Sequence, residues 1–308
     1  MMKGSVALRN SIKYSQNFLK DQNLAEQLVA NSSITNSDVV YEIGSGKGII
    51  TEILASHCKS VIAIETDPNL AIKLKQKFQH ASNVQIQEID FLVYSLPKYN
   101  YKVFSNIPFN ITASIVRKLV YAPVPPEDCY LIIQQEAAIK LAGTPDKEML
   151  FSILIKPLFE LSIIHHFKRT DFIPEPNVSI VLLRIHKRNV PLILEGQNSM
   201  YKDFVSYAFN RSIPDLRNGM KHIFTSNQFS RLARDFQFKE SITPSQLTFD
   251  QWLSLFKSFV VLVDTKKRQI VYGSEARLRK EQSQIDKIHR TRVSKHWKQE
   301  GIKLKHDQ

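Results

Sequence analysis

Three of the nine glycines in this 308-residue chain fall within five positions, at Gly44, Gly46 and Gly48. The residues just before them, 39–43, form a short apolar run that is typical of a buried strand. Apolar residues over 49–54 then recur at helical spacing. Glycine lets a backbone turn tightly and approach a ligand closely. The pattern therefore predicts a ligand-binding turn between a first strand and a first helix.

The rest of the first half alternates in the same way. Further strands are predicted over 60–65, 84–89, 101–105 and 129–134, with helices over 70–78, 112–121 and 136–142. Two later apolar runs, 161–167 and 178–185, predict two more strands. The alternation of the first five strands with helices predicts a parallel sheet covered by helices on both faces. With the two later strands, which a turn separates, the prediction is a seven-stranded α/β fold of Rossmann-like type.

The pattern changes after about residue 201, where apolar residues recur at three and four positions and predict a small helical domain. We expect an α/β domain over 1–188, a helical domain over 189–264 and a basic extension over 265–308. Apolar residues are too sparse in the extension to build a core of their own.

The net charge of +13 indicates an anionic partner, and nucleic acid is the usual one. The extension holds 13 Lys and Arg against 5 Asp and Glu, so most of the excess lies outside the two domains. Three roles stay open for it: electrostatic binding to RNA, a disordered solubilising tail, or docking on a protein.

Several classes of protein are disfavoured. No apolar run approaches the roughly 18–20 residues of a membrane span, and the first residues lack the apolar segment of a signal peptide. Cys58 and Cys129 stand far apart, with no spacing typical of a disulfide framework or a zinc site. We therefore expect a cytoplasmic protein with no membrane contact and no metal.

Two acidic residues follow the glycine loop at the ends of the next strands. Glu65 lies 21 positions after Gly44, where a carboxylate can accept hydrogen bonds from both ribose hydroxyls, and Asp90 is placed to meet an adenine amine. Ile49 stands where a dinucleotide fingerprint requires a third glycine, and its branched side chain would crowd a pyrophosphate. The pattern favours S-adenosylmethionine as the cofactor.

A second loop, Asn106-Ile107-Pro108-Phe109, ends the fourth strand, at the sheet edge where ligands bind in open α/β folds. The Asn106 side-chain oxygen and the Ile107 carbonyl could accept the two N–H bonds of an adenine amine. Pro108 would fix the backbone, and Phe109 offers a flat face for the base to stack on. The loop is suited to methylation of an amine, in which positioning supplies much of the catalysis.

Five motifs in this order resemble one family. They lie at 15–19 (SQNFL), 42–48 (EIGSGKG), Asp90, 106–112 (NIPFNIT) and 172–178 (FIPEPNV). The chain is similar to the rRNA adenine N6-methyltransferase family over about residues 14–264, and most closely to its Erm branch. Erm enzymes dimethylate one adenine of 23S rRNA and confer resistance to macrolides, lincosamides and streptogramin B.

The resemblance implies a role for each matching residue. The residues expected to bind the cofactor are Gln16, Asn17, Leu19, Gly44, Gly46, Glu65, Thr66, Asp90, Phe91 and Asn106. The expected catalytic loop is Asn106, Ile107, Pro108 and Phe109, with Phe172 closing over the flipped base from its other face. Basic side chains at Lys47, Arg117, Lys118 and Arg211 are candidates for RNA contacts, and the expected partner of the monomer is 23S rRNA.

Alternatives from within and outside the family stay open. The family's housekeeping small-subunit enzyme, KsgA, typically has Pro and Leu in the first loop and Leu-Pro-Tyr in the second. Here Ser45, Lys47, Ile107 and Phe109 favour Erm. The family often shows Val-Asp-Ser after the double-proline turn, whereas Val178 is followed by Ser179 and Ile180. A non-catalytic nucleic-acid-binding factor of the same fold is the alternative from another class. An NAD-dependent oxidoreductase is disfavoured by Ile49.

Overall fold

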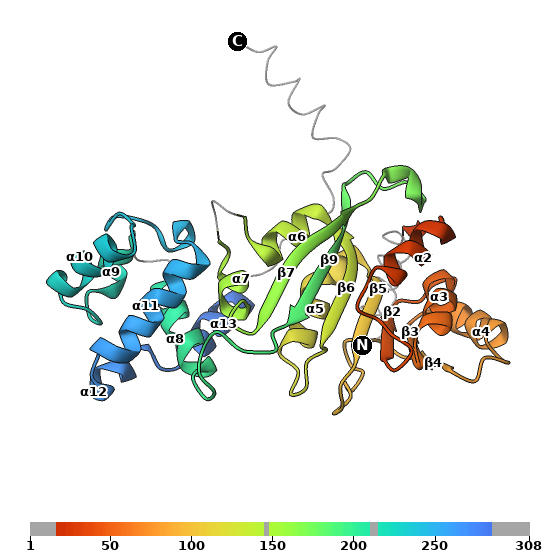
Figure 1. Cartoon of the computed structure of the whole chain (residues 1–308), viewed down its shortest axis with the longest axis horizontal. Helices are drawn as coiled ribbons and strands as arrows, with labels where there is room; N and C mark the ends of the chain where they lie inside the picture. The colour runs from red at the N-terminus through yellow and green to blue at the C-terminus, as the bar shows by residue number, and fades with distance from the viewer. Residues whose placement is uncertain (1–16, 145–147, 210–214, 285–308) are drawn as a thin grey trace, which may run out of the picture.

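The computed structural model describes residues 17–144, 148–209 and 215–284 (Figure 1). Its main sheet has seven strands in the order β4-β3-β2-β5-β6-β9-β7. The strands are β2 (Val39–Ile43), β3 (Ser60–Glu65), β4 (Val84–Glu88), β5 (Lys102–Asn106), β6 (Asp128–Gln134), β7 (Phe159–His166) and β9 (Ile180–Lys187). All seven predicted strands are confirmed, with bounds shifted by up to two residues.

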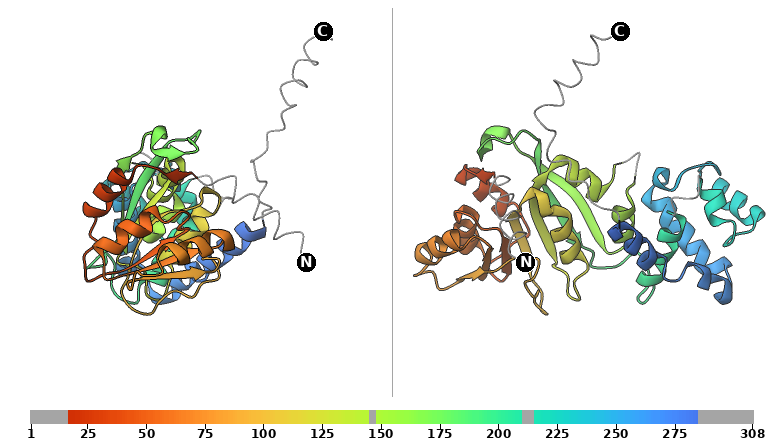
Figure 2. Two further views of the ribbon diagram at one scale, coloured as in Figure 1. Left: turned by 90° about the vertical axis from the view of Figure 1, so that its right-hand side faces the viewer. Right: turned by 180° about the vertical axis from the view of Figure 1, so that it is seen from behind.

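Side chains alternate between the two faces of the sheet, and each face is buried by helices (Figures 1 and 2). On β2, Val40 packs into a core with α2 and α3, whereas Tyr41 and Ile43 pack into a core with α5 and α6. The helices concerned are α2 (Gln22–Ala30), α3 (Ile49–His57), α5 (Thr112–Val120) and α6 (Gln135–Ala142), with α4 (Pro68–Lys77) between β3 and β4 in the chain. The inner strands β2 and β6 and the neighbouring β3 are mostly apolar because both of their faces are covered, whereas the edge strand β7 alternates buried and exposed residues.

The sheet is mixed and not wholly parallel. Strands β2 to β6 pair in parallel, but β9 inserts between β6 and β7 and is antiparallel to both. The parallel arrangement predicted for the strands that alternate with helices is confirmed. The last two strands are antiparallel to each other because no crossover helix joins β7 to β9, and a direct return reverses the strand direction.

A two-stranded ribbon joins the first and last of the sequence motifs. Its strands, β1 (Phe18–Leu19) and β8 (Phe172–Ile173), pair antiparallel. The Lys20 backbone N–H also donates to the Asp171 carbonyl at 2.9 Å. This short ribbon holds the N-terminal motif beside the sheet.

The helical part contains α8 (Asn198–Ala208), α9 (Leu216–Met220), α10 (Ser226–Asp235), α11 (Phe249–Leu262), α12 (Thr265–Arg268) and α13 (Ser274–Gln284). Its core reaches past the boundary expected at residue 264, since Val271 is fully buried in it. The core also takes Ile153 and Leu154 from α7 (Leu150–Ile155), whose next residue, Ile155, belongs to the core of the sheet. The two parts are thus joined by one shared helix.

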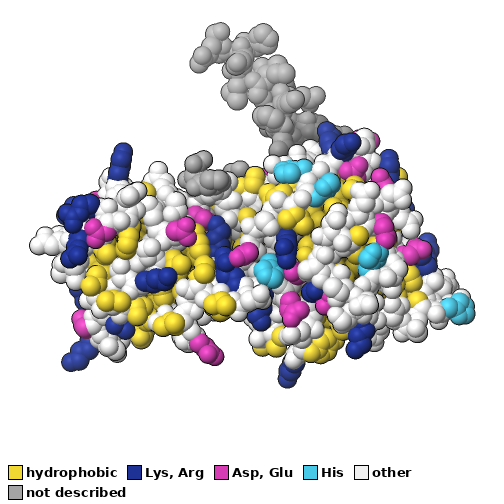
Figure 3. All heavy atoms as spheres, in the orientation of Figure 1, with side chains coloured by type: hydrophobic (Ala, Val, Ile, Leu, Met, Phe, Trp, Pro, Cys, Tyr) yellow, Lys and Arg dark blue, Asp and Glu magenta, His cyan; other side chains and the backbone are white. Residues whose placement is uncertain are grey.

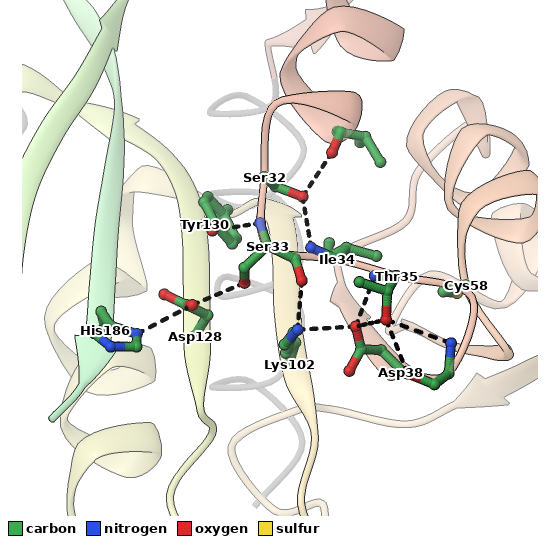
Figure 4. Close-up of polar contacts among 12 residues, drawn as sticks. Ser32, Ser33, Ile34, Thr35, Asp38, Cys58, Lys102, Asp128, Tyr130 and His186 are labelled. Carbon is green, nitrogen blue, oxygen red and sulfur yellow. Dashed lines mark hydrogen bonds and ion pairs between the residues drawn. The ribbon is translucent and has the colours of Figure 1, made fainter. Parts of the chain in front are cut away.

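A polar network lies where the parallel strands begin, at the opposite end of the sheet from their carboxyl ends (Figure 4). The buried carboxylate of Asp128 accepts hydrogen bonds from Arg184 at 2.8 and 2.9 Å and from the Ser33 hydroxyl at 2.8 Å. Lys102 donates to Asp38 at 2.8 Å. Burial would raise the pKa of Asp128, but the hydrogen bonds from Arg184 and Ser33 outweigh it and hold this pKa below its ordinary value. The network ties the segment after α2 to β5, β6 and β9.

Asp128→Ala is expected to lower the free energy of unfolding by about 3 kcal/mol, because it leaves Arg184 and Ser33 without their partner. Urea unfolding at pH 7 measures this change. Glu136→Ala is the matched control: it breaks a fully exposed pair with Lys140, which water and salt screen, and should lower the free energy of unfolding far less. Equal losses in the two variants would contradict a structural role for the network.

No helix in the described ranges is long and apolar enough to cross a membrane.

Candidate active site

Three adjoining pockets lie at the carboxyl ends of β2, β3 and β5. Gly44 lines all three, and each is also lined by at least one residue of the segment 106–111. Most of the predicted site residues converge there. The predicted residues that line the pockets are Asn17, Leu19, Gly44, Lys47, Glu65, Thr66, Asp90, Phe91, Asn106, Ile107, Pro108 and Phe109. Gln16 and Arg211 lie outside the described residues.

The glycine loop follows β2 in a conformation that only glycine adopts without strain. Gly44 and Gly46 have φ angles of +75° and +56°. A Cβ on Gly46 would also lie 2.6 Å from the ring of Phe18. The N-terminal motif therefore packs directly on the loop, and Phe18 lines two of the three pockets.

Glu65 fixes this loop to the end of β3. One oxygen of its buried carboxylate accepts from the Gly46 N–H at 2.8 Å, and the other accepts from the Asp67 N–H at 2.9 Å. Each carboxylate oxygen has a second lone pair, so both can still accept a hydroxyl. The geometry is compatible with the predicted ribose contact and adds a second role, because the same carboxylate shapes the loop.

Asp90 and Phe91 lie on a loop after β4 that is held by Lys118. One Asp90 oxygen accepts from the Leu92 N–H at 2.8 Å, and the Phe91 ring is buried. The Lys118 ammonium donates to the carbonyls of Phe91, Leu92 and Tyr94 at 2.7, 2.9 and 2.5 Å, and lies 5.1 Å from the Phe91 ring centroid. Burial lowers the pKa of Lys118, while Asp90 opposes this shift.

The predicted RNA contact at Lys118 is therefore corrected, since all three N–H donors of its ammonium are committed to this loop. Lys118 is next to Arg117 in the sequence, which indicates that both belong to one basic face of the helix. The structure instead directs the Lys118 side chain toward the loop after β4. Arg117 itself is exposed, with its guanidinium 5.8 Å from the Phe151 ring centroid.

The Asn106 side chain is oriented by the N-terminal motif. Its amide nitrogen donates to the Asn17 carbonyl at 2.7 Å, and no described donor bonds its amide oxygen. The Ile107 carbonyl accepts no backbone hydrogen bond from the described residues. Pro108 lies against the glycine loop, 3.5 Å from where a Gly44 Cβ would stand. Asn106 and Ile107, both of which line the pocket, thus each keep an acceptor oxygen that the described residues leave available.

The two predicted stacking aromatics differ in their placement. Phe109 is partly exposed and lines the pocket, as a stacking face requires. Phe172 is only 1% exposed, and its ring packs on Phe167 with centroids 5.3 Å apart. The expected role of Phe172 over a flipped base is corrected for this conformation, because β8 pairs with β1 and turns the ring into the core.

Sequence reasoning overlooked Glu42 and Ser45 as site residues, although both lie in a quoted motif. Glu42 lines the pocket beside the glycine loop, and its carboxyl accepts a short hydrogen bond from Thr51. Burial raises the pKa of Glu42 to about 8, against the effect of this bond. The buried Ser45 hydroxyl lies close enough to the Glu42 carboxyl to lower its pKa, yet it makes no hydrogen bond of ordinary geometry among the described residues. The sequence held one indication of this role, because Glu42 is an acidic residue only two positions before Gly44.

The protein-family comparison matches residues 7–260 to the ribosomal RNA adenine dimethylase family. The chain is 32% identical over 254 residues to an rRNA adenine N-6-methyltransferase of Limosilactobacillus reuteri, an alignment that covers 82% of this chain and 97% of that protein. The chain belongs to this family. It is a family of methyl-transferring enzymes, and a relative of the same description from Escherichia coli is 29% identical with 98% of its length covered.

Two solved structures have the same fold as this chain. The 23S rRNA methyltransferase ErmE superposes with a TM-score of 0.74 at 24% identity, covering 79% of this chain and 100% of ErmE. A dimethyladenosine transferase from Plasmodium falciparum gives 0.64 at 19% identity, covering 79% and 98%. The family match ends at residue 260, so α12 and α13 lie beyond it.

No group of His, Cys, Asp and Glu that could hold a metal ion is found among the described residues of this family member.

Glu42→Gln is expected to make stability less sensitive to alkaline pH. The raised pKa means that the stability linked to the protonated acid is full below about pH 4 and is lost as pH rises through about 8. Gln keeps the neutral form, so the variant should match the native protein at pH 5 and exceed it by a few kcal/mol at pH 9, at roughly 1.4 kcal/mol per pKa unit.

Urea unfolding at pH 5, 7 and 9 measures the difference. Glu52→Gln, on the exposed outer side of α3, is the control and should shift little across this range. Parallel pH curves for the native protein and Glu42→Gln would rule out the raised pKa.

Proposed function

We propose that this protein transfers methyl groups from S-adenosylmethionine to the N6 amine of a specific adenine in 23S rRNA. The observation that carries the proposal is the position of the Asn106 loop. It adjoins Glu65, Asp90 and the glycine loop, Asn106 and Ile107 both line the pocket, and the Asn106 amide nitrogen is committed to the Asn17 carbonyl, which leaves the amide oxygen as an acceptor.

The residues present fit this cofactor. Glu65 would accept the ribose hydroxyls, and Asp90 has one oxygen available for the adenine amine. The Ser45 hydroxyl and the Glu42 carboxyl line the pocket beside the glycine loop and would be available to polar groups of the methionine part. When bound, the cofactor supplies a methyl group activated by a sulfonium sulfur.

The chain's own residues would hold the target amine for this transfer. Asn106 and Ile107 would accept its two N–H bonds, which aims the nitrogen lone pair, and Phe109 would stack on the base. Held in this way, the amine nitrogen would receive the methyl group that the bound cofactor supplies, and the proton that it then loses would leave to solvent. Extracting the base from its stack costs a few kcal/mol, which stacking on Phe109 partly offsets.

The choice of 23S rRNA rests on the loop residues that favour the Erm branch, which are Ser45, Lys47, Ile107 and Phe109. The fold of ErmE, a 23S rRNA methyltransferase, and its full-length match support it. With this substrate, methylation would confer macrolide, lincosamide and streptogramin B resistance, and the protein would act in the cytoplasm as a monomer.

Asn106→Ala is expected to lower methyl transfer at least about 100-fold, because the amine loses an acceptor that positions it. Incorporation of labelled methyl is measured on protein-free 23S rRNA and on assembled small subunits. Asn100→Ala, an exposed residue before β5, is the matched control and should be unchanged.

Primer extension on the methylated 23S rRNA then locates the base, since dimethylation blocks reverse transcription there. Undiminished transfer by Asn106→Ala would remove Asn106 from its role. Methylation of small subunits but not of 23S rRNA would instead support the KsgA-like alternative. Binding of RNA without any turnover would support the non-catalytic factor.

Lys118→Met is expected to weaken S-adenosylmethionine binding about tenfold, because the loop that carries Asp90 and Phe91 loses three charge-assisted hydrogen bonds. The KM for RNA should not change. Calorimetric titration of the cofactor and steady-state kinetics on RNA measure the two effects. Lys73→Met, an exposed residue of α4, is the control. A higher KM for RNA with unchanged cofactor affinity would restore the RNA-contact role.

A further inference from the structure

A separate cavity of about 220 Å³ lies at the junction of the sheet domain and the helical part. Its walls come from α5, α6, α7, α8 and α13, and it shares no lining residue with the pockets of the candidate active site. Seen from behind in Figure 2, α13 lies across this junction. The catalytic proposal assigns this cavity no function.

The wall formed by α13 is firmly attached to α8. The Asp203 carboxylate accepts hydrogen bonds from the backbone N–H groups of Gly273 and Glu275, both at 3.0 Å. Val271, just before them, is fully buried. Since the family match ends at residue 260, this wall is an addition to the part that the chain shares with its family.

Cations line the cavity at Arg117, Lys140 and Arg279. Figure 3 shows further Lys and Arg side chains at the junction, on the face of the molecule turned away from α13. Arg279 and Lys202 lie over the Tyr121 ring, at 4.5 and 4.3 Å from its centroid. Arg279 also pairs with Glu275 at 2.6 Å. Arg117 lines the cavity, and no described carboxylate lies within 4 Å of its guanidinium. The opening therefore has positive charge available for an anion.

The interior combines an apolar wall with one unsatisfied polar group. Leu150, Phe151, Leu154 and Leu278 form the apolar wall. The Ser206 hydroxyl also lines the cavity, where the residue is only 3% exposed and its oxygen has no hydrogen-bond partner among the described residues. A buried polar atom without a partner is costly and marks a position for a ligand polar group or a water.

We propose that this cavity binds a single nucleotide, with the base against the apolar wall and its phosphate at Arg117 and Arg279. The volume is below the roughly 300 Å³ at which pockets for drug-sized ligands begin, so it suits one base and not a larger ligand. Ser206 would bond a polar edge of the base. This nucleotide belongs to the RNA strand that the enzyme methylates, so the inference rests on the proposed function.

The test compares RNA binding by the full-length native protein and two variants. Leu278→Trp fills the cavity from a half-exposed position, and Arg117→Met removes the unpaired cation. Each is expected to raise the Kd for a fluorescein-labelled single-stranded RNA at least about fivefold, with cofactor affinity and melting temperature unchanged. Arg231→Met, on the exposed surface of α10, is the matched control and should stay within about twofold.

A titration with AMP separates the two sources of the ligand. Competition of AMP with RNA for the native protein, lost in Leu278→Trp, would support the cavity and identify a free nucleotide as a sufficient ligand. RNA binding that weakens in both variants without AMP competition would support the strand-bound nucleotide. Unchanged RNA and AMP binding in both variants would overturn the proposal. Methylation of 23S rRNA by the native protein is scored separately, so failure of the catalytic proposal is distinguishable.

Discussion

The candidate site depends on the pairing of β2 with β3 on one side and with β5 on the other. Ile43 lies opposite Ile64, and Tyr41 lies opposite Val103, so the three parallel strands end close together. From β2 the chain first builds the sheet in one direction, through β3 and β4, and then returns to build it in the other, from β5. The connections that leave β2 and β5 therefore diverge, and a crevice for a ligand forms between them. The glycine loop, Glu65 and Asn106 are the first residues beyond or at these three ends. Any slip in this register would separate them.

The sequence was most informative where a strand is buried on both faces. The runs at 39–43 and 60–65 match β2 and β3 without any shift, because a doubly covered strand is apolar throughout and ends at its loop. The glycines, Glu65, Asp90 and Asn106 could be placed for the same reason, since each directly follows or ends such a strand. Their convergence follows from the topology.

Side-chain direction was the part that sequence could not give. Lys118 and Arg117 are neighbours on α5, yet one donates to three carbonyls and the other is exposed. Phe172 and Phe109 both follow sheet strands, yet only the pairing of β8 with β1 decides that Phe172 is buried. The division of one short helix between two cores was likewise not visible in the sequence, since Ile153 packs in the helical part and Ile155 packs against the sheet. These outcomes depend on contacts between segments far apart in the chain.

The distribution of charge separates two ligands of opposite sign. Glu65 and Asp90 line one of the proposed cofactor pockets, and carboxylates there favour a sulfonium cation over the pyrophosphate of a dinucleotide. The cations lie elsewhere, at the junction around Tyr121 and in the basic sequence after residue 264. A chain with a net charge of +13 can therefore attract RNA over long distances while it keeps an acidic interior at the site of transfer. In this arrangement the RNA backbone is drawn to the surface, and only an uncharged base needs to enter the acidic pocket.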